Sequence, residues 1–210
     1  MALTPRVTPF GDAAVLVELG DVYDESIAGW ARALADLWDL GPAVPAYASV
    51  MLSFDPDVFE PEIAERRVRD LLAAGPRFGA TTGESRIVQI PTRYDGVDLA
   101  DVAQRSGMSV DELVAVHSGR DYSAIFVGFL PGFAYCARLD PRIVAPRLER
   151  PREKVPAGAV AVADGQTSVY PFASPGGWRL IGTTDVVMFD PSAAQPSRIR
   201  AGDRVRFTPR

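Results

Sequence analysis

Three short segments in the second half of the chain carry residue types that could bind a small charged molecule. The first is FVGFLPGFAY, at 126–135, in which aromatic residues crowd a tight turn. The turn is Pro131-Gly132, and the aromatic residues beside it are Phe129, Phe133 and Tyr135. A hairpin turn with core aromatics would explain the proline and the glycine. The crowding at the turn itself favours the wall of a ligand pocket, with backbone N–H groups turned outward.

The second segment, PRLERPREKVPAG at 146–158, concentrates positive charge between prolines that stiffen the backbone. Its cations are Arg147, Arg150, Arg152 and Lys154. Guanidinium groups pair well with carboxylate or phosphate, so the segment could be a rigid arm that holds an anion. Two glutamates partly neutralise the arm, and a solvated loop is the alternative.

The third segment, SPGGWRLIGTT at 174–184, places the turn Pro175-Gly176-Gly177 directly before Trp178 and a strand. Consecutive N–H groups at such a turn can form a nest that binds an oxyanion or a phosphate. A plain hairpin turn is again the alternative.

His117 is the only histidine, and it lies at the end of an expected helix in register with apolar residues. That spacing favours a packed helix-end histidine over a general base or donor at the mouth of a site. A chain with one histidine and no Cys-x-x-Cys pair cannot form a multi-histidine or paired-thiolate centre, so we predict that it has no metal site. Walker A, Gly-x-Ser-x-Gly and His-Glu-x-x-His sequences are absent, which argues against a self-contained ATPase, serine hydrolase or zincin.

Composition excludes several classes of protein. The net charge is −5, with no basic run, which argues against nucleic acid and anionic membranes as partners. No window approaches the ~18 apolar residues of a spanning helix, and the N-terminus lacks the apolar core of a secretory signal. Cys136 is the single cysteine, which indicates a reducing compartment, and we expect the cytoplasm.

Hydrophobic periodicity predicts the elements that position these segments. An N-terminal α/β domain at 1–80 contains expected strands at 13–19 and 49–54 and expected helices at 27–38 and 61–75. The aperiodic segment 73–85 marks the boundary to a second domain at 81–210. That domain begins with a strand at 85–91 and a helix at 98–106 with Asp98 as its N-cap. A second helix starts at Ser109, where Glu112 completes a capping box.

Short strands separated by turns follow from Tyr122 onward and predict a β-sandwich or barrel. We expect them in the runs YSAIFVGF, GAVAVA, TSVY, WRLIG, DVVMF and DRVRF.

Longer runs around the same three segments, in this order, resemble the family of 5-oxoprolinase B subunits. The runs are HSGRDYSAIFVGFLPGFAYCARLD, PRLERPREKVPAGAVAVADGQTSVYP and SPGGWRLIGTT. The family is also called allophanate hydrolase subunit 1 and includes the sporulation-kinase inhibitor KipI. The resemblance covers essentially the whole chain and is most specific over 117–183.

The resemblance implies an α+β fold, with a small N-terminal α/β domain followed by a cyclophilin-like β-barrel domain. It also implies a relation to one half of the carboxyltransferase domain of urea carboxylase. The activity it implies is the ATP-dependent opening of 5-oxoproline to glutamate, a lactam hydrolysis that needs two partners, a homologous C subunit and an A subunit. We therefore expect a small anionic amide or lactam substrate, ATP shared with the partner subunits, and little activity of the chain alone.

Lactam opening needs cations and N–H donors around developing negative charge. On that basis, we expect catalytic roles for His117, Tyr122, Arg152 and Lys154. We expect substrate binding by Phe129, Pro131, Gly132, Phe133, Tyr135, Arg147, Pro175, Gly176, Gly177 and Trp178, in one cavity with the catalytic residues. Two positions depart from the family pattern: Thr183 replaces the usual arginine, and Asp164 replaces a usual glycine.

Three functions remain open from the sequence. They are an enzyme subunit for 5-oxoproline, an allophanate hydrolase or urea carboxyltransferase-like subunit, and a KipI-type inhibitor of a sensor histidine kinase. Neighbouring genes for the A and C subunits, for a biotin carboxylase or for a sensor kinase would distinguish them.

Overall fold

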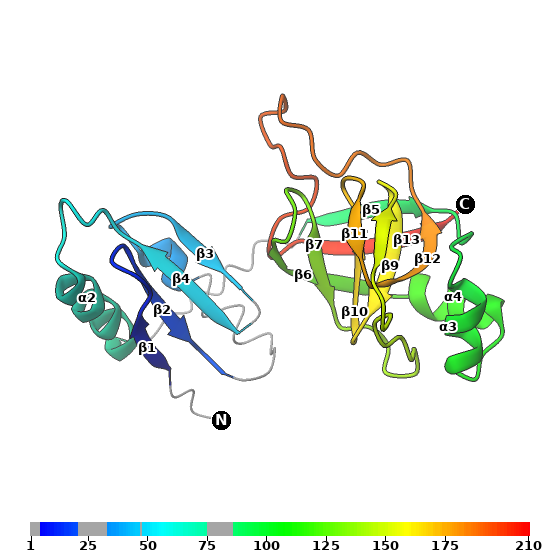
Figure 1. Cartoon of the computed structure of the whole chain (residues 1–210), viewed down its shortest axis with the longest axis horizontal. Helices are drawn as coiled ribbons and strands as arrows, with labels where there is room; N and C mark the ends of the chain where they lie inside the picture. Colours follow the sequence, from blue (N-terminus) through cyan, green and yellow to red (C-terminus); the bar gives the residue numbers. More distant parts are fainter. Residues whose placement is uncertain (1–4, 21–32, 47, 75–85) are drawn as a thin grey trace. The chain divides into compact units, whose positions relative to one another are not determined.

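The computed structural model describes residues 5–20, 33–46, 48–74 and 86–210. The chain divides into two units, Met1–Gly83 and Glu84–Arg210 (Figure 1). The boundary expected at 80 and 81, and most of the expected linker at 73–85, lie outside the described residues.

The N-terminal unit is an antiparallel sheet with helical residues packed against it. Its strands follow the order β1-β2-β4-β3, with bounds Arg6–Pro9 for β1, Ala14–Glu18 for β2, Ser49–Ser53 for β4 and Ala43–Pro45 for β3. Alternation places the apolar residues of β2 and β4 in one core with residues of helix α2 (Pro61–Ala74). The strands expected at 13–19 and 49–54 and the helix expected at 61–75 are confirmed. Of the helix expected at 27–38, the structure describes 33–38, and residues 33–37 are helical.

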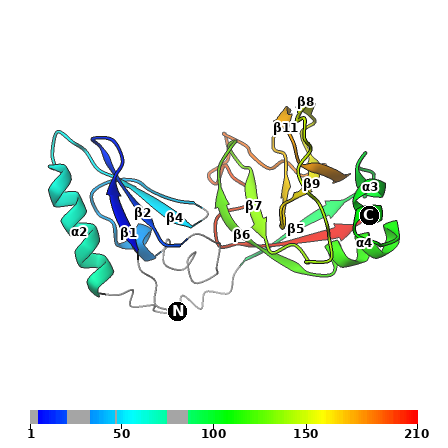
Figure 2. The same ribbon diagram turned by 60° about the horizontal axis from the view of Figure 1, so that its bottom comes forward.

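The second unit is built on one sheet of seven strands in the order β12-β9-β10-β7-β6-β13-β5 (Figures 1 and 2). Their bounds are β5 Ile87–Thr92, β6 Asp121–Val127, β7 Ala134–Ala137, β9 Ala159–Ala163, β10 Gln166–Val169, β12 Arg179–Thr183 and β13 Arg204–Pro209. Arg93, just after β5, exchanges backbone hydrogen bonds of 2.7 and 2.8 Å with Thr183 of β12. This contact joins the two edges of the sheet, and the expected β-barrel is confirmed as a nearly closed one.

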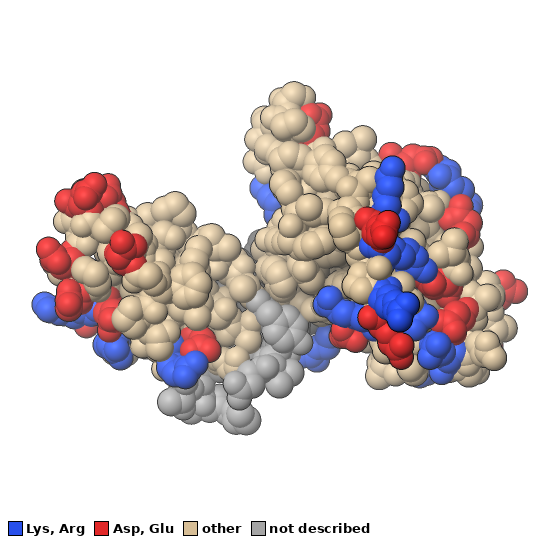
Figure 3. All heavy atoms as spheres, viewed as in Figure 1, with Lys and Arg blue, Asp and Glu red and all other residues tan. Residues whose placement is uncertain are grey.

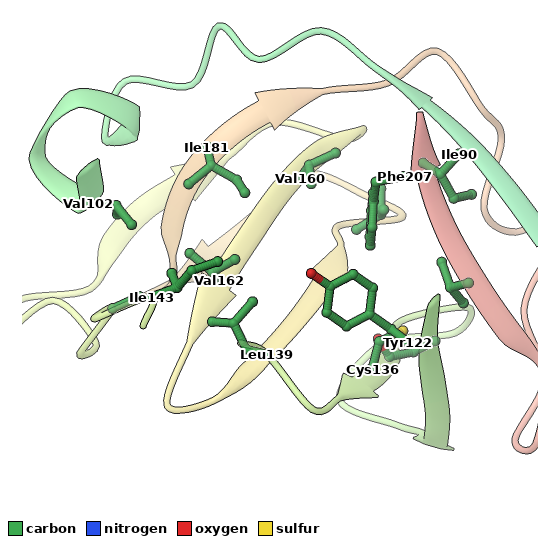
Figure 4. Packing of buried hydrophobic residues seen from close by; sticks show 14 of the residues in the cluster. Ile90, Val102, Tyr122, Cys136, Leu139, Ile143, Val160, Val162, Ile181 and Phe207 are labelled. Carbon is green, nitrogen blue, oxygen red and sulfur yellow. The ribbon is translucent and has the colours of Figure 1, made fainter. Parts of the chain in front are cut away.

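Buried apolar side chains fill the barrel, as Figure 4 shows. They include Ile90, Tyr122, Val160, Val162, Ile181 and Phe207. Helices α3 (Leu99–Arg105) and α4 (Val110–Ser118) lie together at one end of the barrel in both ribbon views. The capping box of α4 is confirmed, since the Ser109 hydroxyl accepts the Glu112 N–H and the Glu112 carboxylate accepts the Ser109 N–H.

Two predictions about this unit are corrected by the structure. Asp98 stands at the N-cap of α3, but its carboxylate makes no capping hydrogen bond, because it accepts the N–H of Leu180 from β12 instead. The run DVVMF at 185–189 is not a strand. Its backbone pairs within its own loop, where the Arg198 N–H donates to the Met188 carbonyl.

Candidate functional site

Strands β7, β9 and β12 separate two layers of side chains, and the predicted site residues fall on both layers. In β9, Val160 and Val162 point into the barrel core, while the three alanines of the strand face the other way. In β7, Cys136 lies inside and Tyr135 outside. Successive residues of a strand point to opposite faces of the sheet. The small alanines therefore leave room for a layer of larger side chains on the outer face.

That outer layer, here called the aromatic layer, consists of Phe126, Phe133, Tyr135, Tyr170 and Trp178. Phe133 is fully buried at its centre, with ring centroids 4.9 Å from Tyr135, 5.2 Å from Tyr170 and 5.5 Å from Trp178. These pairs meet edge to face, a favourable geometry for aromatic rings. Tyr135 also stacks on Phe126 at 4.2 Å.

Phe129 lies at the rim of the aromatic layer. Its ring meets Phe133 at 5.4 Å, and the residue is 60% exposed. The structure thus brings together four of the predicted binding residues, namely Phe129, Phe133, Tyr135 and Trp178.

The third segment, at 174–184, contributes a short strand where the sequence predicted a turn. Residues 174–176 form strand β11, which pairs with β8 (Arg152–Val155). Because N–H groups of an extended strand alternate in direction, Pro175-Gly176-Gly177 does not form the predicted anion nest. A glycine is still required at 176, since a Cβ atom there would lie 2.3 Å from the Tyr170 hydroxyl.

Arg147 is the cation that lies on the aromatic layer. Its guanidinium carbon is 5.8 Å from the centroid of the Trp178 ring, a cation–π contact. Its Nε donates to the Asp164 carboxylate at 2.9 Å, and both side chains are more than half exposed. Burial raises the pKa of the neighbouring Tyr135, and Arg147 offsets part of that effect. No described residue hydrogen-bonds to the Tyr135 hydroxyl, so a guanidinium and a phenol lie on one apolar surface with free donor capacity.

The other cations of the arm do not join Arg147. Arg152 donates to the Asp98 carboxylate at 2.7 Å and to the Trp178 carbonyl at 3.3 Å, which ties β8 to α3 and β12. Lys154 is exposed to solvent two residues further on. Figure 3 shows arginine, lysine and carboxylate side chains interleaved on the visible face of this unit, without a continuous basic surface.

His117 lies inside the barrel and is fully buried. Its Nδ1 is 2.8 Å from the Tyr94 hydroxyl, and its Nε2 is 3.0 Å from the Thr167 hydroxyl. Because Thr167 donates its own proton to the Ala161 carbonyl, it accepts from Nε2–H, and Tyr94 donates to Nδ1. Burial lowers the pKa of His117 to about 3, so the imidazole is neutral at pH 7.

Tyr122 belongs to the same interior cluster. Its buried hydroxyl donates to the His117 carbonyl at 2.8 Å, and desolvation raises its pKa. The prediction that His117, Arg152 and Lys154 converge on the turn at 131–132 is therefore wrong. The helical spacing directs His117 into the barrel, whereas the aromatic turn and the arm lie on the opposite face of the sheet.

The turn at Pro131-Gly132 requires a glycine at its second position. Gly132 has a φ of +80°, and a Cβ atom there would lie 2.8 Å from Phe189 Cβ and 2.9 Å from the Met188 carbonyl oxygen. Both the backbone conformation and the close approach exclude a larger residue. Pro131 beside it is exposed.

Sequence reasoning missed two residues that shape this region. Tyr170 lies under Gly176 and against Phe133, and the alternation in TSVY could have placed it on the outer face. Asp98 links Arg152 and Leu180, which are 54 and 82 residues away in sequence, so no local pattern could have revealed its role.

The described residues contain neither a metal-binding group of side chains nor a membrane-spanning helix. None of their His, Cys, Asp and Glu side chains form a group of three that could hold a metal ion. None of their helices combines the length and the apolar character needed to cross a membrane.

Comparison with known proteins assigns the chain to a family. Residues 5–199 match the family described as carboxyltransferase domain, subdomain C and D. A protein of Escherichia coli O157:H7, named as the B subunit of 5-oxoprolinase, is 37% identical over 95% of this chain and 93% of its own length.

Solved structures agree with this assignment. The crystal structure of TTHA0988 superposes with a TM-score of 0.83 at 38% identity, over 94% of this chain. This chain spans 40% of that longer chain. The Kluyveromyces lactis urea amidolyase shares the fold, with a TM-score of 0.76 at 17% identity over 99% of this chain and 15% of its own.

The family match runs through both units, and a similar relative is covered over nearly its whole length. The chain therefore belongs to the family of carboxyltransferase subdomains C and D, as its three ordered segments indicated.

Proposed function

We propose that this chain is the B subunit of an ATP-dependent 5-oxoprolinase, which opens 5-oxo-L-proline to L-glutamate together with the A and C subunits. The observation that carries the proposal is the similarity to proteins named as B subunits of 5-oxoprolinase, at 33–41% identity. The likeness to urea amidolyase at 17% identity concerns the fold alone and does not favour urea chemistry.

The reaction breaks the C–N bond of a lactam, which is a poor electrophile. Transfer of the terminal phosphoryl group of ATP to the lactam oxygen would release ADP and make the ring carbon a better electrophile. Water would then add to that carbon, and the C–N bond would break as the ring nitrogen takes a proton and becomes the amine of glutamate. A second water would hydrolyse the acyl phosphate that remains, which gives the side-chain carboxylate and inorganic phosphate. The sequence lacks a Walker A loop, so in this proposal ATP is bound with the help of the partner subunits. The complex is cytoplasmic, where ATP and a reduced Cys136 are both expected.

The chain's own contribution is to bind and orient the substrate on the aromatic layer. A five-membered lactam is small and flat, and in this proposal it lies at the edge of the aromatic layer, against the exposed Phe129 and the half-buried Tyr135, because the centre of the layer is buried. Arg147 provides a guanidinium for the substrate carboxylate, and the Tyr135 hydroxyl provides a donor beside it. Arg150 and Lys154, both exposed on the same arm, supply further positive charge for a phosphate. In this scheme His117 holds the barrel together and does not touch the substrate.

Reconstitution with one component left out tests this role in the complex. A mixture of the purified A, B and C subunits should hydrolyse ATP only when 5-oxoproline is present, and omission of this chain should abolish that activity. The chain alone should have no ATPase activity. Full turnover by this chain alone, or by the other two subunits without it, would contradict the proposal.

An Arg147→Ala variant tests the site. Loss of a charge-assisted hydrogen bond worth about 1.5–3 kcal/mol should raise the KM for 5-oxoproline by roughly 10- to 100-fold. Arg142→Ala is the matched control, because Arg142 is similarly exposed but pairs with Asp140 two residues away. Equal KM values for the two variants would remove Arg147 from the site while leaving the role of the chain in the complex intact.

A further inference from the structure

A two-residue turn, Asp164-Gly165, joins strands β9 and β10. The strands pair up to Ala163 and Gln166, and the two turn residues have φ values of +47° and +79°. Positive φ at both central positions defines a type I′ hairpin turn, which accepts aspartate, asparagine or glycine at its first position. The backbone of the turn therefore tolerates Asp164 but does not depend on its carboxylate.

The Asp164 carboxylate is hydrogen-bonded to Arg147, the cation on the aromatic layer. Arg147 Nε donates to Oδ2 of Asp164 at 2.9 Å. The Asp164 N–H donates to the Ala145 carbonyl at 3.0 Å, so one residue holds the segment around Arg147 with both its backbone and its side chain. No other hydrogen bond to the described residues engages the Arg147 guanidinium. The donors on Nη1 and Nη2 are thus available to a ligand.

The backbone on both sides of Arg147 is fixed. The Leu148 N–H donates to the Gly177 carbonyl at 2.8 Å. On the other side, Arg179 Nε donates to the Pro146 carbonyl at 3.0 Å. With the backbone held, the rotamer of the Arg147 side chain decides where its guanidinium lies on the aromatic layer. The hydrogen bond to the Asp164 carboxylate restrains that rotamer.

We propose that Asp164 is a positioning residue, whose carboxylate oxygen orients the Arg147 guanidinium to bind the substrate carboxylate through Nη1 and Nη2. The inference rests on the proposed function, in which Arg147 binds the carboxylate of 5-oxoproline. Because Nε is engaged and the guanidinium lies over the Trp178 ring, the edge formed by Nη1 and Nη2 remains for two parallel hydrogen bonds to one carboxylate. A guanidinium that is already held in place loses less conformational freedom when the substrate binds.

Charge and positioning predict different effects of changing Asp164. If only charge matters, the carboxylate weakens the attraction of Arg147 for an anion, and asparagine and glycine at 164 should both lower the KM for 5-oxoproline. If positioning matters, Asp164→Asn keeps an oxygen that accepts from Arg147 Nε, whereas Asp164→Gly removes it. Both variants suit the type I′ turn, and both partners are more than half exposed, so the fold should be retained.

The KM and kcat for 5-oxoproline, measured with the full chain reconstituted with the A and C subunits, test the proposal. Asp164→Gly should raise the KM by about 3- to 5-fold with kcat unchanged. Asp164→Asn should recover the KM to within about twofold of the wild type. In an Arg147→Ala background, Asp164→Gly should have no further effect. Asp39→Gly is the matched control, because Asp39 is a similarly exposed carboxylate that pairs instead with Arg67.

The outcomes separate the role of Asp164 from the proposed function. A higher KM in Asp164→Gly that asparagine recovers, and that disappears without Arg147, supports the proposal. An active complex in which the glycine and asparagine variants have equal KM values overturns it, and so does an effect of Asp164→Gly that persists in the Arg147→Ala background; the proposed function stands in both cases. A wild-type complex that does not turn over 5-oxoproline overturns the proposed function, and this inference with it.

Discussion

Replacing Arg152 by alanine tests whether this cation of the arm stabilises the fold through its ion pair with Asp98. The sequence suggested that Arg152 is an exposed catalytic cation, whose removal would weaken substrate use and leave the fold intact. In the structure, the Arg152 side chain is 27% exposed and lies 2.7 Å from an Asp98 carboxylate that is 10% exposed. Its removal would leave that carboxylate buried with the Leu180 N–H as its remaining partner.

The expected loss of stability follows from this geometry. Breaking a buried ion pair costs about 3–5 kcal/mol when the remaining charge has no other partner. The partial exposure of Arg152 and the retained Leu180 hydrogen bond reduce that figure to about 2 kcal/mol. For a chain of this size, the thermal midpoint should fall by roughly 4–8 °C.

Thermal unfolding of the full chain, followed by circular dichroism, measures the effect. Lys154→Ala is the control on the same strand and should leave the midpoint unchanged, because Lys154 is exposed. Adding Asp98→Asn to Arg152→Ala should recover about 1 kcal/mol, since the unpaired charge is removed. The reasoning is refuted if Arg152→Ala and Lys154→Ala have the same midpoint while Arg152→Ala alone raises the KM for 5-oxoproline.

Two further predictions concern the barrel. Burial lowers the pKa of His117 from 6.5 in the unfolded chain to about 3 in the folded one. The contribution of the neutral imidazole to the free energy of unfolding is therefore complete above pH 6.5 and is lost as the pH falls toward 3. Stability should drop by about 2 kcal/mol more between pH 7 and pH 5 in the wild type than in His117→Gln, and parallel pH profiles in urea unfolding would contradict this. Gly132→Ala should destabilise the chain more than Gly165→Ala, since both glycines have a φ near +80° but a Cβ meets neighbours only at Gly132; equal urea midpoints would refute the close approach.

Local patterns were sufficient to predict most elements of the fold. The alternation in AAVLVEL and the capping box at Ser109 depend on neighbours a few residues apart, and both are confirmed. The prediction of a strand in the run DVVMF was wrong, because the sequence of a segment cannot show whether its backbone pairs with a sheet or within its own loop. The hydrogen bond from Arg198 to Met188 decides that question.

The candidate site was predictable only in part. The aromatic run at 126–135 showed which rings would gather, because they are close in sequence. The sequence did not show on which face of the sheet His117 would lie relative to Arg147. That depends on how α4 packs on the barrel and on long-range pairs such as Arg152 with Asp98. Residue types thus indicated the chemistry, while the topology determined which residues could share a site.

The most direct test of the proposed function is the product formed by the reconstituted complex of this chain with the A and C subunits. Glutamate and ADP should be measured together, with 5-oxoproline, urea or allophanate offered in separate reactions. The proposed function predicts equal amounts of glutamate and ADP from 5-oxoproline, and no turnover of urea or allophanate. Turnover of allophanate or urea without any glutamate from 5-oxoproline would contradict it.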